Sequence, residues 1–534
     1  MNASRSANNP AKSAAQPSPA WARVLFPSVA DLIFLVLAFL LSCGTIAPRL
    51  LGDAGIGWHI RNGELMLQTH AITRTDPFSS TMQGKPWYAW EWLYDLLIAT
   101  MHHWMGLNGV VLLTALVIAA TFALTLRLAL QRGASLQVAV VLVLLAAGAS
   151  TIHFLARPHV LSWLFTVVWF GKLDSFEISP QHWRRLLWLP ALMLLWVNVH
   201  GGFLVGFALL AIYLLSGFVR WISAAAEAKG AAKQSLQRLA GTAVLCLLAS
   251  LVNPYGYKLY VHIYGYLTDR FLMNHIDEFL SPNFHGVAQQ CFAALLLITL
   301  VALAVRRETL PLSQLLVALF AAYSGLYATR NLPVSAILLT LLIAPWLTRS
   351  MDRAGTNESI QPWLRRCFRR GQSFAARMGR MEAAARWHLW PTAACAFLLW
   401  VAAHGGNLGP QRLMNARFDH KRFPVEAAEI ASELGIHEPI FCPDSWGGYL
   451  IYRLYPQVHV VVDDRHDLYG PEFLKKYLTL VRVEPGWEEV LNGEHANWLL
   501  LPAESPLANV LKQTDGWEAV HEDSTAILFE RVET

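Results

Sequence analysis

The sequence predicts a polytopic α-helical membrane protein with a small α/β domain at its carboxy-terminal end. Of its 534 residues, 55% are hydrophobic and only 15% are charged, and the mean hydropathy is +0.37. The apolar residues form long runs, and roughly 20 such residues cross about 30 Å of hydrocarbon as a helix. Residues 405–534 instead alternate helical and strand patterns, which is typical of a small α/β domain.

The amino-terminal segment, residues 1–27, is rich in Ala, Ser, Asn and Pro. We expect it to be disordered and cytoplasmic. It differs from a cleaved signal peptide because the apolar run that follows is too long and has no clear small-residue cleavage site. The membrane region is predicted to extend from 28 to 349, with one more span after it.

Eleven apolar runs are candidate membrane spans. They lie at 28–48, 107–128, 135–152, 157–171, 186–199, 200–222, 236–252, 290–305, 311–328, 331–349 and 389–404. The fifth and sixth runs meet at His200-Gly201-Gly202, so we expect a sharp turn there. The aromatic-rich stretch 90–104 is either a twelfth, short span or a helix lying in the membrane interface.

The distribution of Lys and Arg predicts the orientation, because basic residues near spans stay in the cytoplasm. Residues 349–386 contain nine arginines, which indicates that the linker at 350–388 is cytoplasmic. With eleven spans, the amino terminus is then cytoplasmic, and the loop at 49–106 and the region 405–534 lie outside a bacterial inner membrane. The basic loops account for the net charge of +5, so nucleic acid is not an expected partner.

Polar and ionisable residues collect at the predicted external ends of the spans. Such groups are costly at membrane depth and usually line a cavity or pathway. We therefore expect one shared site, although each residue alone could simply solvate the end of a loop. The set comprises Asp53, His59, Arg61, Glu64, Asp76, Glu91, His153, Arg157, His159, Asn198, His200, Asn253, Tyr255, Asp277, Glu278, Arg330 and Asn331.

The first external loop carries the motifs "DAGIGWHIRNGE", "TRTDPFSST" and "GKPWYAWEWL". With the many spans and the extracytoplasmic domain, it resembles the GT-C superfamily of membrane glycosyltransferases. It is most similar to bacterial polytopic membrane proteins with a "D..WH" and "DPFS.T..G.PW...EWL" first loop. The resemblance implies an acidic catalytic residue in this loop, which Asp53 matches, and a sugar donor on a polyprenyl phosphate. Many GT-C members have two adjacent acids here, whereas Asp53 is followed by Ala54.

The residues themselves allow a consistent chemistry. Sugar transfer from a lipid phosphate needs a base near the acceptor hydroxyl and positive charge or a metal near the phosphate. Asp53 could be the base, and Arg157, Arg330 or His200 could hold the phosphate. Glu64 follows Asp53 by about three helical turns, so both could face one side. Alternatively, Asp53 only caps the following helix.

A divalent metal is a further possibility. Asp53, Asp76 and Glu91 could supply the oxygen ligands that Mg²⁺ or Mn²⁺ prefers. No His spacing resembles a zinc motif, and the six cysteines are scattered and imply no disulfide framework.

The predicted elements of the carboxy-terminal domain are helices at 424–435 and 471–481 and strands at 439–443, 458–464, 498–502 and 526–532. The acidic stretch "DDRHDLYG" at 463–470 follows a strand and could bind an acceptor or a cation. Acidic loops are also common on surfaces, and the pattern favours that interpretation. "DSWGGYLIYRLYP" could begin a helix whose amino terminus holds an anion.

The predicted function is a glycosyltransferase that moves a sugar from a polyprenyl-phosphate-linked donor to a cell-envelope glycan, lipid or protein at the outer face of the inner membrane. The alternative is a non-catalytic envelope protein that binds, transports or assembles a polysaccharide or lipid. A transporter is expected to carry polar groups on both faces and paired broken helices. Polarity on one face favours the enzyme, although a binding pocket would have the same pattern.

Overall fold

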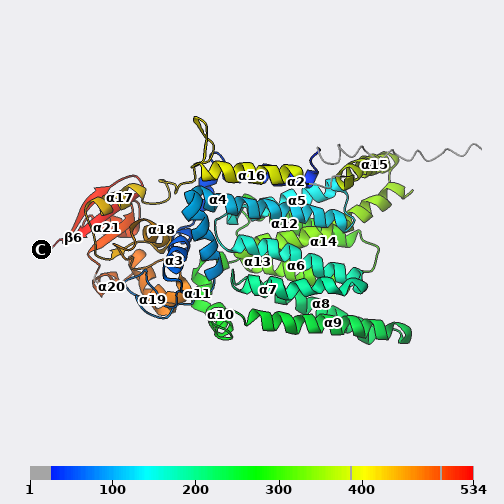
Figure 1. Ribbon diagram of the computed structural model, residues 1–534, viewed down its shortest axis with the longest axis horizontal. Coiled ribbons are helices and arrows are strands. Elements are labelled where there is room, and N and C mark those ends of the chain that lie inside the picture. The colour runs from blue at the N-terminus through cyan, green and yellow to red at the C-terminus, as the bar shows by residue number, and fades with distance from the viewer. Residues whose placement is uncertain (1–25, 385–387, 494–495, 533–534) are drawn as a thin grey trace, which may run out of the picture.

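Long apolar helices form a bundle, and the α/β carboxy-terminal region packs against one end of it (Figure 1). This computed structural model describes residues 26–384, 388–493 and 496–532, so the predicted disorder of residues 1–27 falls almost wholly outside the described residues. Within these described ranges, five segments are long and apolar enough to cross a membrane: Trp92–Gln131, Leu136–His153, Phe203–Ser223, Val287–Ala304 and Thr329–Thr356. The chain is thus a multi-pass membrane protein.

Each of the eleven predicted spans overlaps a helix, although the number that cross the bilayer stays a prediction. These helices are α2 (Val29–Ser42), α4 (Trp92–Gln131), α5 (Leu136–Ser150), α6 (His159–Ile178), α7 (Trp188–Val197), α8 (Phe203–Ser223), α9 (Ala226–Ser250), α12 (Val287–Ala304), α13 (Leu312–Tyr327), α14 (Leu332–Thr356) and α16 (Leu389–Ala403). The predicted turn after α7 is present, with the amide of His200 donating to the carbonyl of Trp196 (3.0 Å).

Shorter elements join these helices. They are η1 (Ala47–Leu51), α3 (Gly55–Thr69), η2 (Thr151–His153), η3 (Pro180–Leu187), α10 (Lys258–Thr268), α11 (Arg270–His275), η4 (Asp277–Phe279), η5 (Thr329–Asn331) and α15 (Pro362–Ala384). In Figure 1, α3, α10 and α11 lie at the end of the bundle next to the carboxy-terminal region, and α15 lies at the opposite end.

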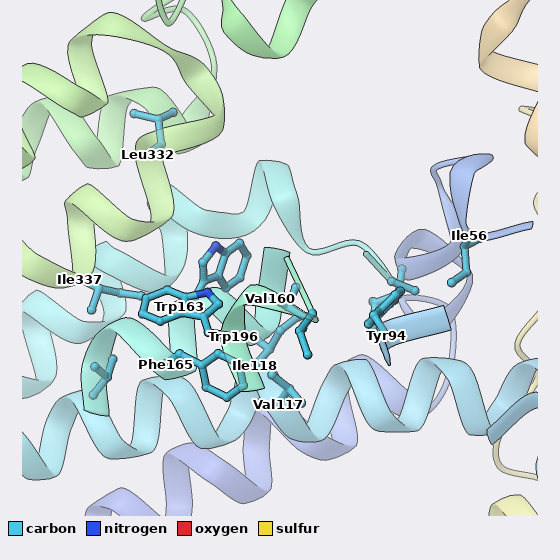
Figure 2. Close-up of a cluster of buried hydrophobic side chains, with 14 of the residues drawn as sticks. Ile56, Tyr94, Val117, Ile118, Val160, Trp163, Phe165, Trp196, Leu332 and Ile337 are labelled. Carbon is cyan, nitrogen blue, oxygen red and sulfur yellow. The ribbon is translucent and has the colours of Figure 1, made fainter. Parts of the chain in front are cut away.

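The core of the bundle is made of aromatic and branched side chains from α4, α6, α7 and α14. Figure 2 shows Trp163 and Trp196 beside Phe165, with Ile118 and Ile337 close by. Both tryptophans are at most 2% exposed. Between helices that span a membrane, close van der Waals packing of such side chains is a main favourable term, because lipid is as apolar as the side chains themselves.

The long helix α4 is broken at Gly106, whose backbone has φ 58° and ψ −154°. Before the break α4 packs on α3, and a Cβ on Gly63 would lie only 2.1 Å from the carbonyl oxygen of Asp95. The stretch 90–104 therefore lies with α3 at the end of the bundle, and whether it crosses the membrane stays a prediction.

The carboxy-terminal region is built around a four-stranded sheet of order β3-β4-β6-β5. Strands β3 and β4 are parallel and the other neighbours are antiparallel, with Leu500 opposite Leu528. The elements are β1 (Asn407–Leu408), β2 (Gln411–Arg412), α17 (Val425–Glu433), β3 (Ile440–Phe441), α18 (Asp444–Leu454), α19 (His466–Val481), α20 (Trp487–Gly493), β4 (Trp498–Pro502), α21 (Pro506–Leu511), β5 (Trp517–Glu522) and β6 (Ala526–Arg531).

Most of the predicted elements of this region are confirmed. The sequence prediction missed β1, β2, α20, α21 and β5. The prediction of a strand at 458–464 is wrong. In this stretch only Val460 forms bridges, and these are isolated bridges to Ile440 and to Ser79. The bridge to Ser79 ties the carboxy-terminal region to the first loop, residues 49–106.

Helices α3 and α18 cross with their backbones in contact. A Cβ on Gly57 would lie 2.0 Å from the carbonyl oxygen of Gly448, and one on Gly448 would lie 2.3 Å from that of Ala54. No side chain larger than hydrogen fits at either position. These glycines set the position of the carboxy-terminal region on the first loop.

Substituting Gly57→Ala should therefore lower the melting temperature of the purified protein. Overpacking of this kind costs about 1–3 kcal/mol, because backbone has to move. Gly265→Ala in α10 is the control, since nothing lies within 4 Å of its added Cβ. Equal melting temperatures for Gly57→Ala and Gly265→Ala would contradict the proposed role of the crossing.

Candidate functional site

A polar cavity of about 510 Å³ lies where the helix bundle, the first loop and the carboxy-terminal region meet. The three parts of the chain contribute charged side chains to the same space. The lining residues include Asp53, Trp58, Trp87 and Glu91 from the first loop, Arg157, Glu278 and Arg330 from the bundle, and Arg422, Asp444, Asp464 and His466 from the carboxy-terminal region.

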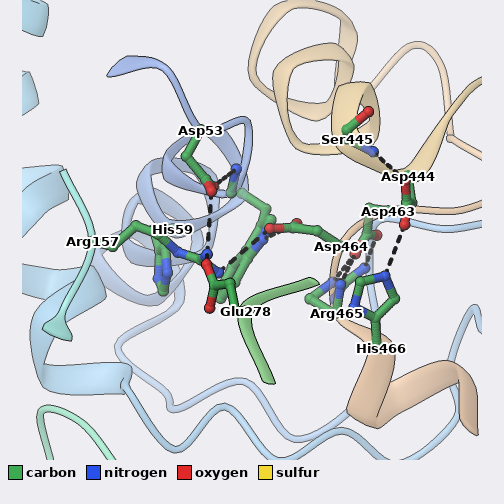
Figure 3. A network of polar contacts seen from close by, with 12 residues as sticks. Asp53, His59, Arg157, Glu278, Asp444, Ser445, Asp463, Asp464, Arg465 and His466 are labelled. Carbon is green, nitrogen blue, oxygen red and sulfur yellow. Dashed lines mark hydrogen bonds and ion pairs between the residues drawn. The ribbon is translucent and has the colours of Figure 1, made fainter. Parts of the chain in front are cut away.

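Arg157, just before α6, is the centre of the charge network (Figure 3). Its Nη1 lies 3.2 Å from Oδ2 of Asp53 and 3.1 Å from Oε1 of Glu278. Its Nη2 lies 3.6 Å from Oδ2 of Asp464. One guanidinium thus joins carboxylates from all three parts of the chain. Burial alone would raise the pKa of Glu278, but Arg157 and Arg330 outweigh it and lower this pKa to about 2.

Asp53 both caps a helix and faces the cavity. Its Oδ1 accepts from the amide of Gly55 (2.9 Å) at the start of α3, while its Oδ2 pairs with Arg157. The two sequence interpretations of this residue are therefore compatible. Gly55 has no room for a side chain, since a Cβ would lie 2.5 Å from Oδ2 of Asp464 and 2.9 Å from Oδ1 of Asp53. The two carboxylates meet over this glycine.

Asp464 is the carboxy-terminal region's main contribution. Its Oδ1 accepts from Nε1 of Trp58 (2.8 Å) in α3. Burial raises the pKa of Asp464 to about 7, and the charge of Asp53 adds to this effect while Arg157 opposes it. A carboxyl of this kind can hold or release a proton near neutral pH.

Arg465, the residue after Asp464, holds this segment in place through ion pairs with Asp463 and Asp76. Its Nη2 lies 2.6 Å from Asp463 and its Nη1 2.7 Å from Asp76, and its guanidinium lies over the ring of Trp87 (4.5 Å). Asp463 is fully buried and Arg465 is 3% exposed. The favoured interpretation of 463–470 as a surface loop is therefore wrong, because the acids of this loop are bound internally.

His466 and Asp444 form a second pair at the wall of the cavity, 2.8 Å apart. Burial alone would lower the pKa of His466, but its hydrogen bond to Asp444 outweighs burial and raises it. Asp444 is also the first residue of α18, so the predicted helix start in "DSWGGYLIYRLYP" is confirmed.

Glu91 lies between two imidazoles. Nε2 of His59 and Nε2 of His200 each lie 3.7 Å from its carboxylate. His59 is buried and its Nδ1 is 2.5 Å from Oδ1 of Asp95. Burial, together with the charge of Asp95, raises the pKa of Glu91 to about 8. The two histidines stand behind Glu91 and do not line the cavity themselves.

Six of the predicted residues line the cavity: Asp53, Glu91, Arg157, Asp277, Glu278 and Arg330. Arg61 and Glu64 instead pair with each other (2.8 Å), and Glu64 also contacts His102 (3.0 Å). The expectation that Glu64 faces the same side as Asp53 is wrong. The helical period does not extend to Asp53, because this residue precedes α3.

The other predicted residues hold the loops around the cavity. The carboxylate of Asp76 pairs with Arg465 and accepts hydrogen bonds from the amides of Phe78 and Ser79. Asn198 accepts from Nε1 of Trp92 (2.8 Å). The remaining bonds join His159 to the carbonyl of His153, Asn253 to the amide of Tyr255, the hydroxyl of Tyr255 to the carbonyl of Thr73, and Asn331 to the carbonyl of Ser324.

The predicted metal ligands do not form a set, because the oxygens of Asp76 are occupied and this residue does not line the cavity. Within the described part of the chain, the groups close enough to share an ion are Glu426, His521 and Asp523, none of which lines the cavity. Metal dependence stays a prediction.

Two arginines of the cavity are available for an anion. Among the described residues, no carboxylate lies within 4.0 Å of Arg330 or Arg422; Arg330 lies over the ring of Phe279 (5.0 Å). Arg330 was predicted. Arg422, Asp444, Asp464 and His466 were not among the predicted site residues, although the stretch "DDRHDLYG" signalled two of them.

No family model and no curated protein sequence matches the chain. Its fold is similar to that of the oligosaccharyltransferase of Archaeoglobus fulgidus, over 89% of this chain and 68% of that chain, with 12% identity and a TM-score of 0.53. The oligosaccharyltransferase AglB from Archaeoglobus fulgidus, in complex with an inhibitory peptide and a dolichol-phosphate, gives a TM-score of 0.55, also at 12% identity, over 89% of this chain and 69% of that chain. ArnT from Cupriavidus metallidurans bound to undecaprenyl phosphate has a TM-score of 0.47 and 13% identity, over 94% and 97%. The expected GT-C-like fold is confirmed.

The raised pKa of Asp464 predicts a pH-dependent stability. The folded protein binds this proton more tightly than the unfolded chain, whose Asp pKa is about 3.9, so wild type should lose stability relative to Asp464→Asn as the pH rises from about 4 through about 7. Melting temperatures measured across this range test the prediction, with the exposed Glu472→Gln as control for loss of a surface charge. A constant difference between wild type and Asp464→Asn would contradict it.

Proposed function

We propose that this chain, a multi-pass membrane protein of GT-C-like fold, is a glycosyltransferase. It moves a sugar from a polyprenyl-phosphate donor to a hydroxyl of a cell-envelope glycan, lipid or protein. The cavity at the junction with the carboxy-terminal region is the proposed active site, at the outer face of the inner membrane. The supporting comparison is the archaeal oligosaccharyltransferase, which shares the fold and has been captured with a dolichol-phosphate.

The observation that carries the proposal is the arrangement of charge in the cavity. Asp53 lies beside Arg157, and Arg330 lines the same cavity without a carboxylate partner among the described residues. Arg157 is already held by three carboxylates, so it organises the acids. Arg330 is free to take a phosphate, and a guanidinium suits phosphate oxygens because it can bind two of them at once.

The proposed reaction uses Asp53 as the base. As the acceptor oxygen bonds to the anomeric carbon, its proton passes to Asp53, and the bond from that carbon to the phosphate oxygen breaks. The electron pair leaves with the phosphate, whose charge Arg330 stabilises. Asp464, which shares the space over Gly55 with Asp53, is placed to exchange the proton with it.

A divalent cation is part of the proposal as a possible cofactor. Asp53 and Asp464 carry oxygen ligands of the type that Mg²⁺ or Mn²⁺ prefers, and they meet over Gly55, but both already contact Arg157, which an ion would have to displace. When bound, such an ion would supply positive charge near the leaving phosphate.

Asp53→Asn should lower turnover of a polyprenyl-phosphate sugar by about 10²- to 10⁴-fold, since it removes the base. The amide oxygen can still accept from Gly55, but the amide nitrogen then faces Nη1 of Arg157, so the melting temperature should fall and turnover is compared at a temperature at which both proteins are folded. The assay follows transfer of labelled sugar by the purified protein, with Glu472→Gln as the control. Donor that binds without turnover in wild type would favour the alternative of a binding or transport protein, and full activity of Asp53→Asn would exclude Asp53 as the base.

Arg330→Gln should weaken donor binding by about 10- to 100-fold, because a charge-assisted hydrogen bond contributes about 1.5–3 kcal/mol. The measurement is the dissociation constant of the polyprenyl-phosphate lipid. Arg74→Gln is the matched control, since Arg74 does not line the cavity. Equal affinities of these two variants would show that Arg330 does not hold the phosphate.

A further inference from the structure

A second cavity, of about 1120 Å³, lies at the opposite end of the bundle. One wall is the amphipathic helix α15, at the far end of the molecule in Figure 1. The other wall is made by the end of α4, the start of α5 and the end of α14. The cavity therefore lies where membrane-spanning helices end, at the expected boundary between lipid and water.

The walls of this cavity are largely apolar. Leu130 of α4 and Val138 of α5 face Phe374 and Ala375 of α15 across it. Gly371, one turn before Ala375, also lines the cavity, and nothing lies within 4 Å of a Cβ placed on it. The apolar lining suits a hydrocarbon chain. The volume of the cavity exceeds that of most pockets for small ligands.

In the described part of the chain, the arginines beside this cavity make no close ion pair, although Asp352 and Glu382 also line it. Within the described ranges, no carboxylate lies within 4.0 Å of any arginine of α15 whose side chain is described; these are Arg365, Arg366, Arg369, Arg370 and Arg377. Arg370 and Arg127 both line the cavity. Nη1 of Arg127 donates to Nε2 of His388 (2.7 Å), whose Nδ1 bonds Asp31 (2.7 Å), so Arg127 itself has no carboxylate partner there.

We propose that this cavity binds an anionic phospholipid from the adjacent leaflet. Arg370 and Arg127 supply positive charge for the headgroup phosphate, and an acyl chain lies against Leu130, Val138 and Phe374. The unpaired arginines fit an anionic headgroup, because each basic residue near such a surface contributes about 1 kcal/mol of attraction, which corresponds to about fivefold in affinity. The apolar walls fit a lipid rather than a free phosphate or nucleotide. This site is separate from the proposed active site and does not depend on the proposed function.

The test uses the full-length protein in detergent, supplied with phosphatidylglycerol or phosphatidylcholine and analysed by native mass spectrometry for retained lipid. Wild type should retain phosphatidylglycerol in preference, and inorganic phosphate should not displace it. Arg370→Gln should reduce retention about fivefold, whereas Arg366→Gln, on the same helix but outside the cavity, should reduce it less. Gly371→Leu keeps the charge and improves helix propensity, yet it fills the cavity and should abolish retention.

The proposal is overturned if Arg366→Gln and Arg370→Gln reduce retention equally and Gly371→Leu retains as much lipid as wild type, because the lipid would then be held by surface charge alone. It is also overturned if phosphatidylcholine is retained equally well. Retention that appears only after deletion of residues 2–25 would show that the chain itself, rather than a lipid, occupies the cavity. Melting temperatures of each variant show that lost retention is not lost folding.

Discussion

The contact on which the site depends is the pairing of Arg157 with three carboxylates. Asp53, Glu278 and Asp464 come from parts of the chain separated by more than a hundred residues, and one guanidinium holds all three. A buried arginine without partners would be costly, as would three neighbouring carboxylates without a cation. The assembly is therefore stable only when bundle, first loop and carboxy-terminal region are all in place. Folding and completion of the cavity are coupled.

Backbone contacts supply the precision that charges alone lack. Ion pairs tolerate changes of several tenths of an ångström, but the crossing of Gly57 and Gly448 permits one approach of α3 to α18. Gly55 is equally restrictive, because Asp53 and Asp464 occupy the space of its missing side chain. The short spacing of glycines in "DAGIGWH" thus serves both packing and the placement of two acids.

The helices of the membrane region could be predicted from the sequence, but the full set of residues that line the cavity could not. Apolar runs predicted the helices because span length and hydropathy are local properties. The distribution of Lys and Arg correctly predicted that Asp53, Arg157, Glu278 and Arg330 lie at the same end of the bundle. It could not distinguish a residue that lines the cavity from one, such as Asn198, that only holds a loop. Asp464 and Arg422 were missed because their place depends on how a distant region docks, and Asp463 was misjudged because its partner Arg465 buries it.

The two ends of the bundle differ in how their charges are satisfied, and this difference bears on orientation. At the carboxy-terminal end, Arg157 and Arg465 are paired with carboxylates, and among the described residues only the cavity-lining Arg330 and Arg422 of this site lack a carboxylate within 4.0 Å. At the opposite end, the described arginines of α15 lack carboxylate partners, and Arg349 and Arg353 share the single carboxylate of Glu308. Unpaired positive charge is retained on the cytoplasmic side of bacterial membranes, where anionic lipid balances it. The same asymmetry is what the proposed orientation requires, because in it the proposed base Asp53 and proton carrier Asp464 lie away from the cytoplasmic surface charge.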